Sequence, residues 1–321
     1  MGYEMLNLQE FMAKYSTEEA CLEAIVSHRW PEGFVCPKCG SKSGNQLRCR
    51  RVFQCTDCCS QTSITASTVF HQAKLPLSKW FLAIYFIAAN KQGISSVSLS
   101  KHIGCSHQTA WHMLHKFRNA MRERDVQYLL HGTVVVDEAY VGSEATGSQA
   151  QGRSTETKSV VLVAVEEVEE DVTGFIHLEP IHHADSKSIL PIIESKIAPE
   201  ATIRTDFWSA YNGLSEMGFE HIPEKSAGGQ EASHQFPLVH RAVANLKTWM
   251  LGTFKNFCQR HLDLYAAEFS YRTNRRNRST EERRKNIRES TLAERLIGAS
   301  AKGGWVSWSQ IRANGFRTAS C

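Results

Sequence analysis

The sequence predicts a mixed α/β protein, and three observations support this prediction. Two Cys-x-x-Cys pairs, CPKC and CTDC, lie near the N-terminus. Apolar residues then recur at three- and four-residue steps over residues 76–122, which is the period of helices. Past residue 130, short apolar runs rich in β-branched residues are typical of strands. A chain of 321 residues is long enough to hold two or three domains.

The paired cysteines are Cys36, Cys39, Cys55 and Cys58. Two such pairs can place four thiolates around one tetrahedral Zn²⁺ at about 2.3 Å each. The spacing therefore predicts a zinc ribbon over residues 31–72. Cys49 and Cys59 lie close by as alternative ligands, but Cys58 is preferred over Cys59 because it keeps the two-residue gap from Cys55.

The composition indicates a soluble protein of the cytoplasm. Hydrophobic residues make up 42% of the chain, yet no apolar run reaches the roughly 18 residues that a membrane span needs. The first ten residues lack the basic and apolar regions of a signal peptide. We therefore expect the ten cysteines to be zinc ligands and free thiols, because a reducing compartment disfavours disulfides.

Helices are expected on both sides of the ribbon. Residues 1–30 have helical spacing, with a capping box at Ser16-Thr-Glu-Glu, and residues 61–70 favour a β-hairpin that closes the ribbon. A long helix should run from Pro76 to Gly93. A short helix at 96–103, a turn at Gly104-Cys105 and a helix from about Ser106 to Arg122 then predict a helix-turn-helix.

The second helix of this motif carries the candidate DNA contacts. Residues near its N-terminal end are placed to reach base edges, and basic residues further along are placed to reach phosphate. The first group is His107, Gln108, Thr109 and His112, and the second is Lys116 and Arg118. Many helix pairs with this spacing are only structural.

The remainder of the chain predicts a sheet with helices. GTVVVDEAYVG, SVVLVAVEEV and TGFIHLEPI read as three successive strands of a meander, and TIRTD as a short fourth strand. Helices are expected at 186–196, 207–214, 239–250 and 262–274. Residues beyond 274 are basic and then rich in small residues, so we expect a loosely held tail.

Two carboxylates stand out in these strands. Asp137 is expected at the end of an apolar strand, after the run VVV, and Asp206 at the end of TIRTD. Poorly solvated carboxylates on neighbouring strands repel one another unless a divalent cation separates them, and a pair of such cations can catalyse phosphodiester chemistry. Alternatively, each Asp caps the segment that follows it. Glu138 is the weaker candidate, because its side chain points to the opposite face of the strand.

A basic cluster lies between Arg272 and Arg288. It holds eight Lys or Arg against two Glu, a net charge of +6 in seventeen residues, although the whole chain carries only +4. Such a cluster suits a polyanion, and Arg275 and Arg276 are its candidate DNA contacts. The alternative is a solvated basic helix on the surface.

These motifs occur in an order that resembles the DDE-type insertion-sequence transposases with an N-terminal zinc ribbon, which are related to Merlin transposons. The matching stretches are CPKCG, CTDC, the helix-turn-helix, VVVDEAYVG, TIRTDFWSAYNGL and GTF…HLDLYAAEFSYRTNRR. The resemblance implies an RNase H-like catalytic domain at 131–278, preceded by N-terminal helices and ribbon at 1–72 and a helix-turn-helix region at 73–130. A basic tail at 279–321 would complete the chain.

The resemblance also implies the catalytic residues. Asp137 and Asp206 match the first two acids of the family, whereas His240 stands where relatives carry Glu or Asn, with Lys247 on the family's lysine. His234 is the competitor of His240 if the register differs. An imidazole ligand favours Mn²⁺ over the harder Mg²⁺.

The activity implied is metal-dependent cleavage of the element's terminal inverted repeats and strand transfer to target DNA, by a homodimer or larger assembly on DNA. The alternative is a non-catalytic DNA-binding regulator derived from such an element.

Overall fold

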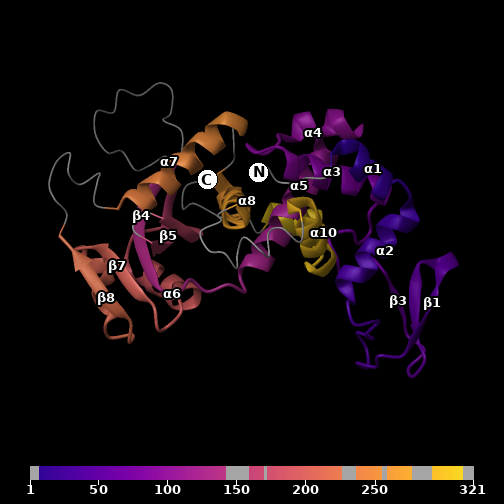
Figure 1. Ribbon diagram of the computed structural model, residues 1–321, viewed down its shortest axis with the longest axis horizontal. Coiled ribbons are helices and arrows are strands. Elements are labelled where there is room, and N and C mark those ends of the chain that lie inside the picture. The colour runs from indigo at the N-terminus through magenta and orange to yellow at the C-terminus, as the bar shows by residue number, and fades with distance from the viewer. Residues whose placement is uncertain are drawn as a thin grey trace. The chain divides into compact units, whose positions relative to one another are not determined.

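The computed structural model describes residues 7–141, 159–169, 172–225, 236–254, 259–276 and 291–313. The chain divides into two compact units (Figure 1). The first joins Met1–Arg124 with Arg288–Arg312, and the second joins Asp125–Ile287 with Ala313–Cys321. The expected boundary near residue 72 therefore does not separate compact units, whereas the one near residue 130 lies close to an observed division.

The first unit begins with two short helices, α1 (Leu8–Lys14) and α2 (Glu18–Arg29). Asn7 and Glu10 form a capping box at the start of α1. Helix α2 is capped by Thr17, whose side chain accepts from the backbone N–H of Ala20, so the cap lies one residue later than predicted. Both helices confirm the expected helical structure over residues 8–29, and residues 1–6 lie outside the described residues.

The ribbon is a three-stranded antiparallel sheet in the order β1 (Gly44–Leu47), β2 (Val52–Cys55), β3 (Gln61–Ser63). A small aromatic cluster supports it: the rings of Phe34 and Phe53 stack at 4.9 Å, and Trp30 meets both edge-on. The predicted hairpin at 61–70 is wrong. Only β3 is a strand, and after it Ile64, Val69 and Phe70 turn into the core, each 1% exposed.

Three helices follow, α3 (Leu77–Ala89), α4 (Ser96–Ile103) and α5 (His107–Asp125). Gly104 ends α4 in the left-handed conformation at φ 61°, where an L side chain is disfavoured. The hydroxyl of Ser106 then accepts from the backbone N–H of Thr109 at 3.1 Å and caps α5. The helix pair thus lies where the sequence predicts it, while its use as a DNA-binding motif stays a prediction.

The expected loose tail is wrong for residues 291–313, which form α10 (Leu292–Lys302) and α11 (Trp308–Ala313). Helix α10 packs on α2 and α3 and buries one side, including Leu296 and Ile297 at 0% exposure. Its Glu294 accepts from Lys14 at 2.8 Å, and the carbonyl of Ser300 accepts from the N–H of Val69. Helix α10 therefore shares one core with the N-terminal helices. The rest of the predicted tail lies outside the described residues.

The second unit contains a five-stranded sheet in the order β6-β5-β4-β7-β8. Strands β4 (Thr133–Val141), β5 (Ser159–Glu169) and β6 (Val172–Ile181) are antiparallel neighbours, which confirms the predicted meander. Strand β7 (Thr202–Asp206) runs parallel to β4, and the edge strand β8 (Glu220–Glu224) runs parallel to β7. The sequence analysis missed β8, because EHIPE is a largely exposed strand without an apolar face.

Helices cover both faces of this sheet (Figure 1). Helices α7 (Pro237–Thr253) and α8 (Leu262–Arg276) pack on one face, and α6 (Ser186–Lys196) with the 3₁₀ helix η2 (Ser209–Leu214) on the other. Alternation along β4 serves both cores: Val135 and Ala139 face α7 and α8, whereas Val136 faces α6. No helix among the described residues is long and apolar enough to cross a membrane.

Candidate active site and zinc site

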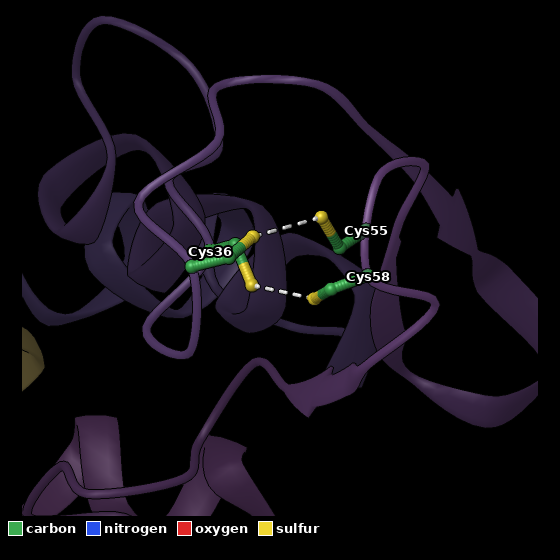
Figure 2. Close-up of side chains that lie close together, drawn as sticks. Cys36, Cys55 and Cys58 are labelled. Carbon is green, nitrogen blue, oxygen red and sulfur yellow. Dashed lines mark hydrogen bonds between the residues drawn. The ribbon is translucent and has the colours of Figure 1, made fainter.

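The four paired cysteines converge in the ribbon. Their sulfur atoms all lie within 4.8 Å of one another, and the contacts between Cys36 and Cys58 and between Cys39 and Cys55 are 3.6 Å. Figure 2 shows Cys36, Cys55 and Cys58 turned toward a common point. Ligands at about 2.3 Å from a tetrahedral centre lie about 3.8 Å apart. The sulfur positions therefore fit one Zn²⁺.

The choice of ligands agrees with the prediction from spacing. Cys58 belongs to this group, whereas Cys49 and Cys59 are exposed and stand outside it. The backbone N–H groups of Cys58 and Asp57 lower the pKa of Cys55 to about 6. The N–H of Cys39 likewise lowers the pKa of Cys36. One cysteine of each knuckle thus favours the thiolate form that binds metal. At Cys39 the backbone N–H of Ser41 lowers the pKa, but the neighbouring thiols and burial outweigh it and raise the pKa to about 12.

Asp137 and Asp206 lie on neighbouring parallel strands of the second unit. The β4–β7 register pairs Val135 with Arg204, and its continuation by two residues sets Asp137 beside Asp206. Side chains alternate along each strand, so both acids share the face of Val135, which is the face that α7 covers. Asp137 lies within β4 rather than at its end, which corrects the expectation from the apolar run.

The two carboxylates influence one another electrostatically. Burial raises the pKa of Asp137 to about 6, the backbone N–H of Glu138 lowers it, and the charge of Asp206 raises it. The positive charge of a protonated His240 lowers it. Asp206 and His240 thus lie close enough to Asp137 to act on its charge. Among the described residues, however, the group whose metal-ligand atoms gather within 4.8 Å is that of the four cysteines, so a divalent cation held by the two acids and His240 stays a prediction.

Glu138 points away from this site, as predicted, and has a partner that the sequence analysis missed. Its carboxylate accepts a short hydrogen bond from the hydroxyl of Tyr211 in η2. Burial raises the pKa of Glu138 to about 7, and Tyr211 is fully buried. The residue after Asp137 is thereby tied to the segment after Asp206, beyond the last paired residues of β4 and β7. In the sequence, only the aromatic residues of FWSAY could have indicated a buried contact here.

Helix α7 presents His240 and Lys247 on its exposed side. Seven residues are two turns, so the two side chains lie along one stripe of the helix. The opposite side of α7, with Leu246 and Met250, packs on the sheet. His234, the alternative to His240, lies outside the described residues.

The predicted base-reading residues lie at the start of α5. His107 and Gln108 are exposed, and Nε2 of His107 lies 2.8 Å from the hydroxyl of Ser96 in α4. Thr109 is half-buried. Burial lowers the pKa of His112 to about 4, so this half-buried residue is neutral at physiological pH. Contacts between these four residues and DNA bases stay a prediction.

The predicted phosphate contacts of Lys116 and Arg118 conflict with the structure. Lys116 is 6% exposed, donates to the carbonyl of Val69 at 3.4 Å and lies 5.6 Å from the ring centroid of Trp80. Arg118 is 2% exposed. Lys116 and Arg118 project from opposite sides of α5, but every residue from Met113 to Met121 is buried, so both side chains are enclosed by protein and out of reach of a phosphate.

Arg275 is likewise engaged inside its own unit. Its guanidinium donates to both carboxylate oxygens of Asp125, at 2.7 and 3.2 Å, and stacks 3.4 Å from the ring centroid of Tyr271. With 10% of the side chain exposed, it ties α8 to Asp125 rather than facing DNA. Arg276 ends α8, and the rest of the basic cluster to Arg288 lies outside the described residues.

Comparison with known proteins identifies the family. Residues 129–274 match the model of the ISXO2-like transposase domain, and residues 16–61 match that of the transposase zinc-ribbon domain. The chain belongs to the insertion-sequence transposases that carry an N-terminal zinc ribbon. The two matches coincide with the sheet that holds Asp137 and Asp206 and with the ribbon that gathers the four cysteines.

A relative of this transposase occurs in Halobacterium salinarum. It is described as an uncharacterized protein in transposable element ISH50, and it is 28% identical over 217 residues, which are 63% of this chain and 71% of the relative.

Solved structures of Mos1 transposase also align. The Mos1 strand transfer complex shows 11% identity over 71% of this chain and 79% of its own, with a TM-score of 0.23. The Mos1 mariner paired end complex with Mn shows 12% identity, coverage of 71% and 80%, and the same TM-score. Scores this low do not establish a common fold.

Proposed function

We propose that this transposase binds the terminal inverted repeats of its own element and cleaves the element's ends, with Asp137, Asp206 and His240 as the ligands of its catalytic divalent cations. The observation that carries the proposal is the placement of the two acids. They occupy neighbouring positions on adjacent parallel strands, on the face over which α7 runs. With its strands numbered in chain order, the sheet reads 3-2-1-4-5, which supports an RNase H-like domain.

Two divalent cations, when bound at these residues, supply an activated water and stabilise the leaving oxygen of a phosphodiester. The chain's own residues prepare the site for them. Burial raises the pKa of Asp137 only to about 6, so its carboxylate would still be available as a ligand at neutral pH. Tyr211 and Glu138 hold the strand segments that follow the two acids. Lys247, two turns along α7 from His240, can neutralise a phosphate of the bound end.

The DNA is held by the first unit in this proposal. The exposed His107 and Gln108 at the start of α5 would read base edges, and the ribbon would add a second contact. Terminal repeats at two ends of an element call for two protomers, so we expect a homodimer or larger assembly on DNA.

Cleavage of a labelled inverted-repeat end tests the proposal. Wild-type protein should nick the end with Mn²⁺ or Mg²⁺. His240→Ala should abolish cleavage about as completely as Asp137→Ala or Asp206→Ala, because the loss of any one residue that acts in a catalytic unit costs about as much rate as the loss of all of them. His240→Glu should retain activity and shift the preference toward Mg²⁺. Asn245→Ala, at an exposed position on another side of α7, is the matched control.

The outcomes separate the alternatives. All the variants should still bind the end, since binding belongs to the other unit. Specific binding without any cleavage by the wild-type protein would favour the non-catalytic regulator. Normal cleavage by His240→Ala would remove His240 from the ligand set.

A further inference from the structure

Phe207 has the most exposed side chain among the large hydrophobic residues that the structure describes. It is 63% exposed and directly follows Asp206 at the carboxyl end of β7. The next aromatic residues turn inward: Trp208 is half-buried, and its ring lies 6.1 Å from that of the buried Tyr211. The segment therefore turns two of its three aromatic rings inward and presents the third beside the candidate catalytic acid.

The backbone fixes the position of this ring. Asp206 Oδ1 accepts a hydrogen bond from the N–H of Trp208 at 3.2 Å, which closes a turn with Phe207 at its centre. The carboxylate and the phenyl ring are thus held by one short, braced segment. A phosphate that reaches Asp206 brings its neighbouring nucleotides to Phe207.

A cation lies beside the ring. Strand β8 pairs Glu224 with Asp206, so Lys225 follows at the same edge of the sheet, and its ammonium lies 6.0 Å from the centroid of Phe207. An exposed aromatic ring next to a basic side chain is the combination by which proteins hold unpaired nucleotides, with the base on the ring and the phosphate near the cation.

We propose that Phe207 stacks on an unpaired base adjacent to the scissile phosphate. This inference rests on the proposed cleavage of DNA ends and names the form of the substrate. Bases inside a duplex are already stacked on both sides, so the ring can take only a base that is frayed, extruded or at a single-stranded end. Phe207 then selects ends that open at the cleavage position.

The experiment combines protein variants with altered DNA, using the full-length protein with Zn²⁺ and Mn²⁺. Phe207→Ala should lower the rate of cleavage of an intact end about tenfold, within the range for loss of one base stack. On DNA with an abasic site at the stacked position, wild type and Phe207→Ala should cleave equally. Phe207→Trp should retain the rate on the intact end. Val126→Ala, also at an exposed apolar position, is the matched control.

A second readout does not depend on cleavage. In the Asp137→Ala background, 2-aminopurine at the stacked position should change fluorescence on binding, and Phe207→Ala should remove the change. Equal losses on intact and abasic DNA, or an unchanged rate and unchanged fluorescence, would overturn the inference while leaving the proposed cleavage intact. A wild-type protein that never cleaves, yet shows the fluorescence change, would count against the cleavage alone.

Discussion

Single residues in this transposase show why a position on a helix does not by itself predict a role. Lys116 lies on the helix that carries the candidate base-reading residues, yet its ammonium is buried against Val69 and Trp80. Burial lowers its pKa to about 8. A buried charge without a carboxylate partner in the described contacts lowers stability, because its hydration is lost.

The sign of the pH dependence follows from this shift. An unfolded chain titrates Lys116 near 10.5 and the folded chain near 8, so the unfolded state binds more protons between these values. The penalty is therefore complete below about pH 8, and stability rises as the pH increases from 8 to 10.5.

Lys116→Met tests this interpretation, because it keeps an unbranched side chain only one atom shorter and removes the charge. We expect the first unit to gain about 1–3 kcal/mol at pH 7, and the gain to shrink toward pH 10. Thermal unfolding at both pH values measures it, with the exposed Lys101→Met as the control. DNA affinity should not change. A loss of affinity in Lys116→Met alone would restore the phosphate contact that burial argues against.

Among the secondary-structure elements, the ribbon depends most on a few side chains. Its three strands contribute few buried residues, and the stacked Phe34 and Phe53 form only a small core. A fold of this size gains the missing stability from its metal. We therefore expect the ribbon to need its zinc in order to fold.

Substitution of one ligand should show this dependence. Cys36→Ser or Cys55→Ser should release about one Zn²⁺ and unfold the ribbon over residues 31–63, while Val69 and Phe70 stay packed in the helical core and the sheet of the second unit stays folded. Metal analysis and hydrogen exchange together measure both effects. Cys49→Ser and Cys59→Ser are the matched controls, because both thiols are exposed and outside the sulfur group. Zinc loss in either control would mean that the ligand set is wrong.

The sequence predicted elements well where an apolar pattern or a cap marks them. The strand around Asp137, the helix at 186–196 and the strand that ends at Asp206 lie at their expected positions. Strand β8 has no such pattern, since its pairing with β7 and not burial defines it. The hydrogen bond between Tyr211 and Glu138 could not be predicted from the sequence either, because the two residues are 73 apart in the chain.

On the scale of the whole molecule, the largest difference from expectation is that α10, near the C-terminus, packs against helices near the N-terminus. The small residues after 290 indicated a tail, yet they let α10 approach α2 and α3 closely. Gly298, for example, leaves 3.2 Å between the position of a Cβ and the ring of His28. The first unit is therefore built from two segments that are far apart in the sequence, and most of the second unit, with its sheet, lies between them in the chain.

Removal of α10 from this core gives the last prediction. Leu296 is fully buried, so Leu296→Ala should destabilise the first unit by about 2–5 kcal/mol through lost burial and a cavity. Leu292→Ala, at a half-buried position of the same helix, should cost less. Hydrogen exchange should rise in α2 and α3 and stay unchanged in β4 and β5.

A fragment of residues 1–130 lacks α10 altogether. It should bind inverted-repeat ends more weakly than the full chain, because it exposes the apolar surface that α10 covers. If this fragment is as stable and binds as tightly as the whole protein, α10 is an accessory of the unit and not part of its core.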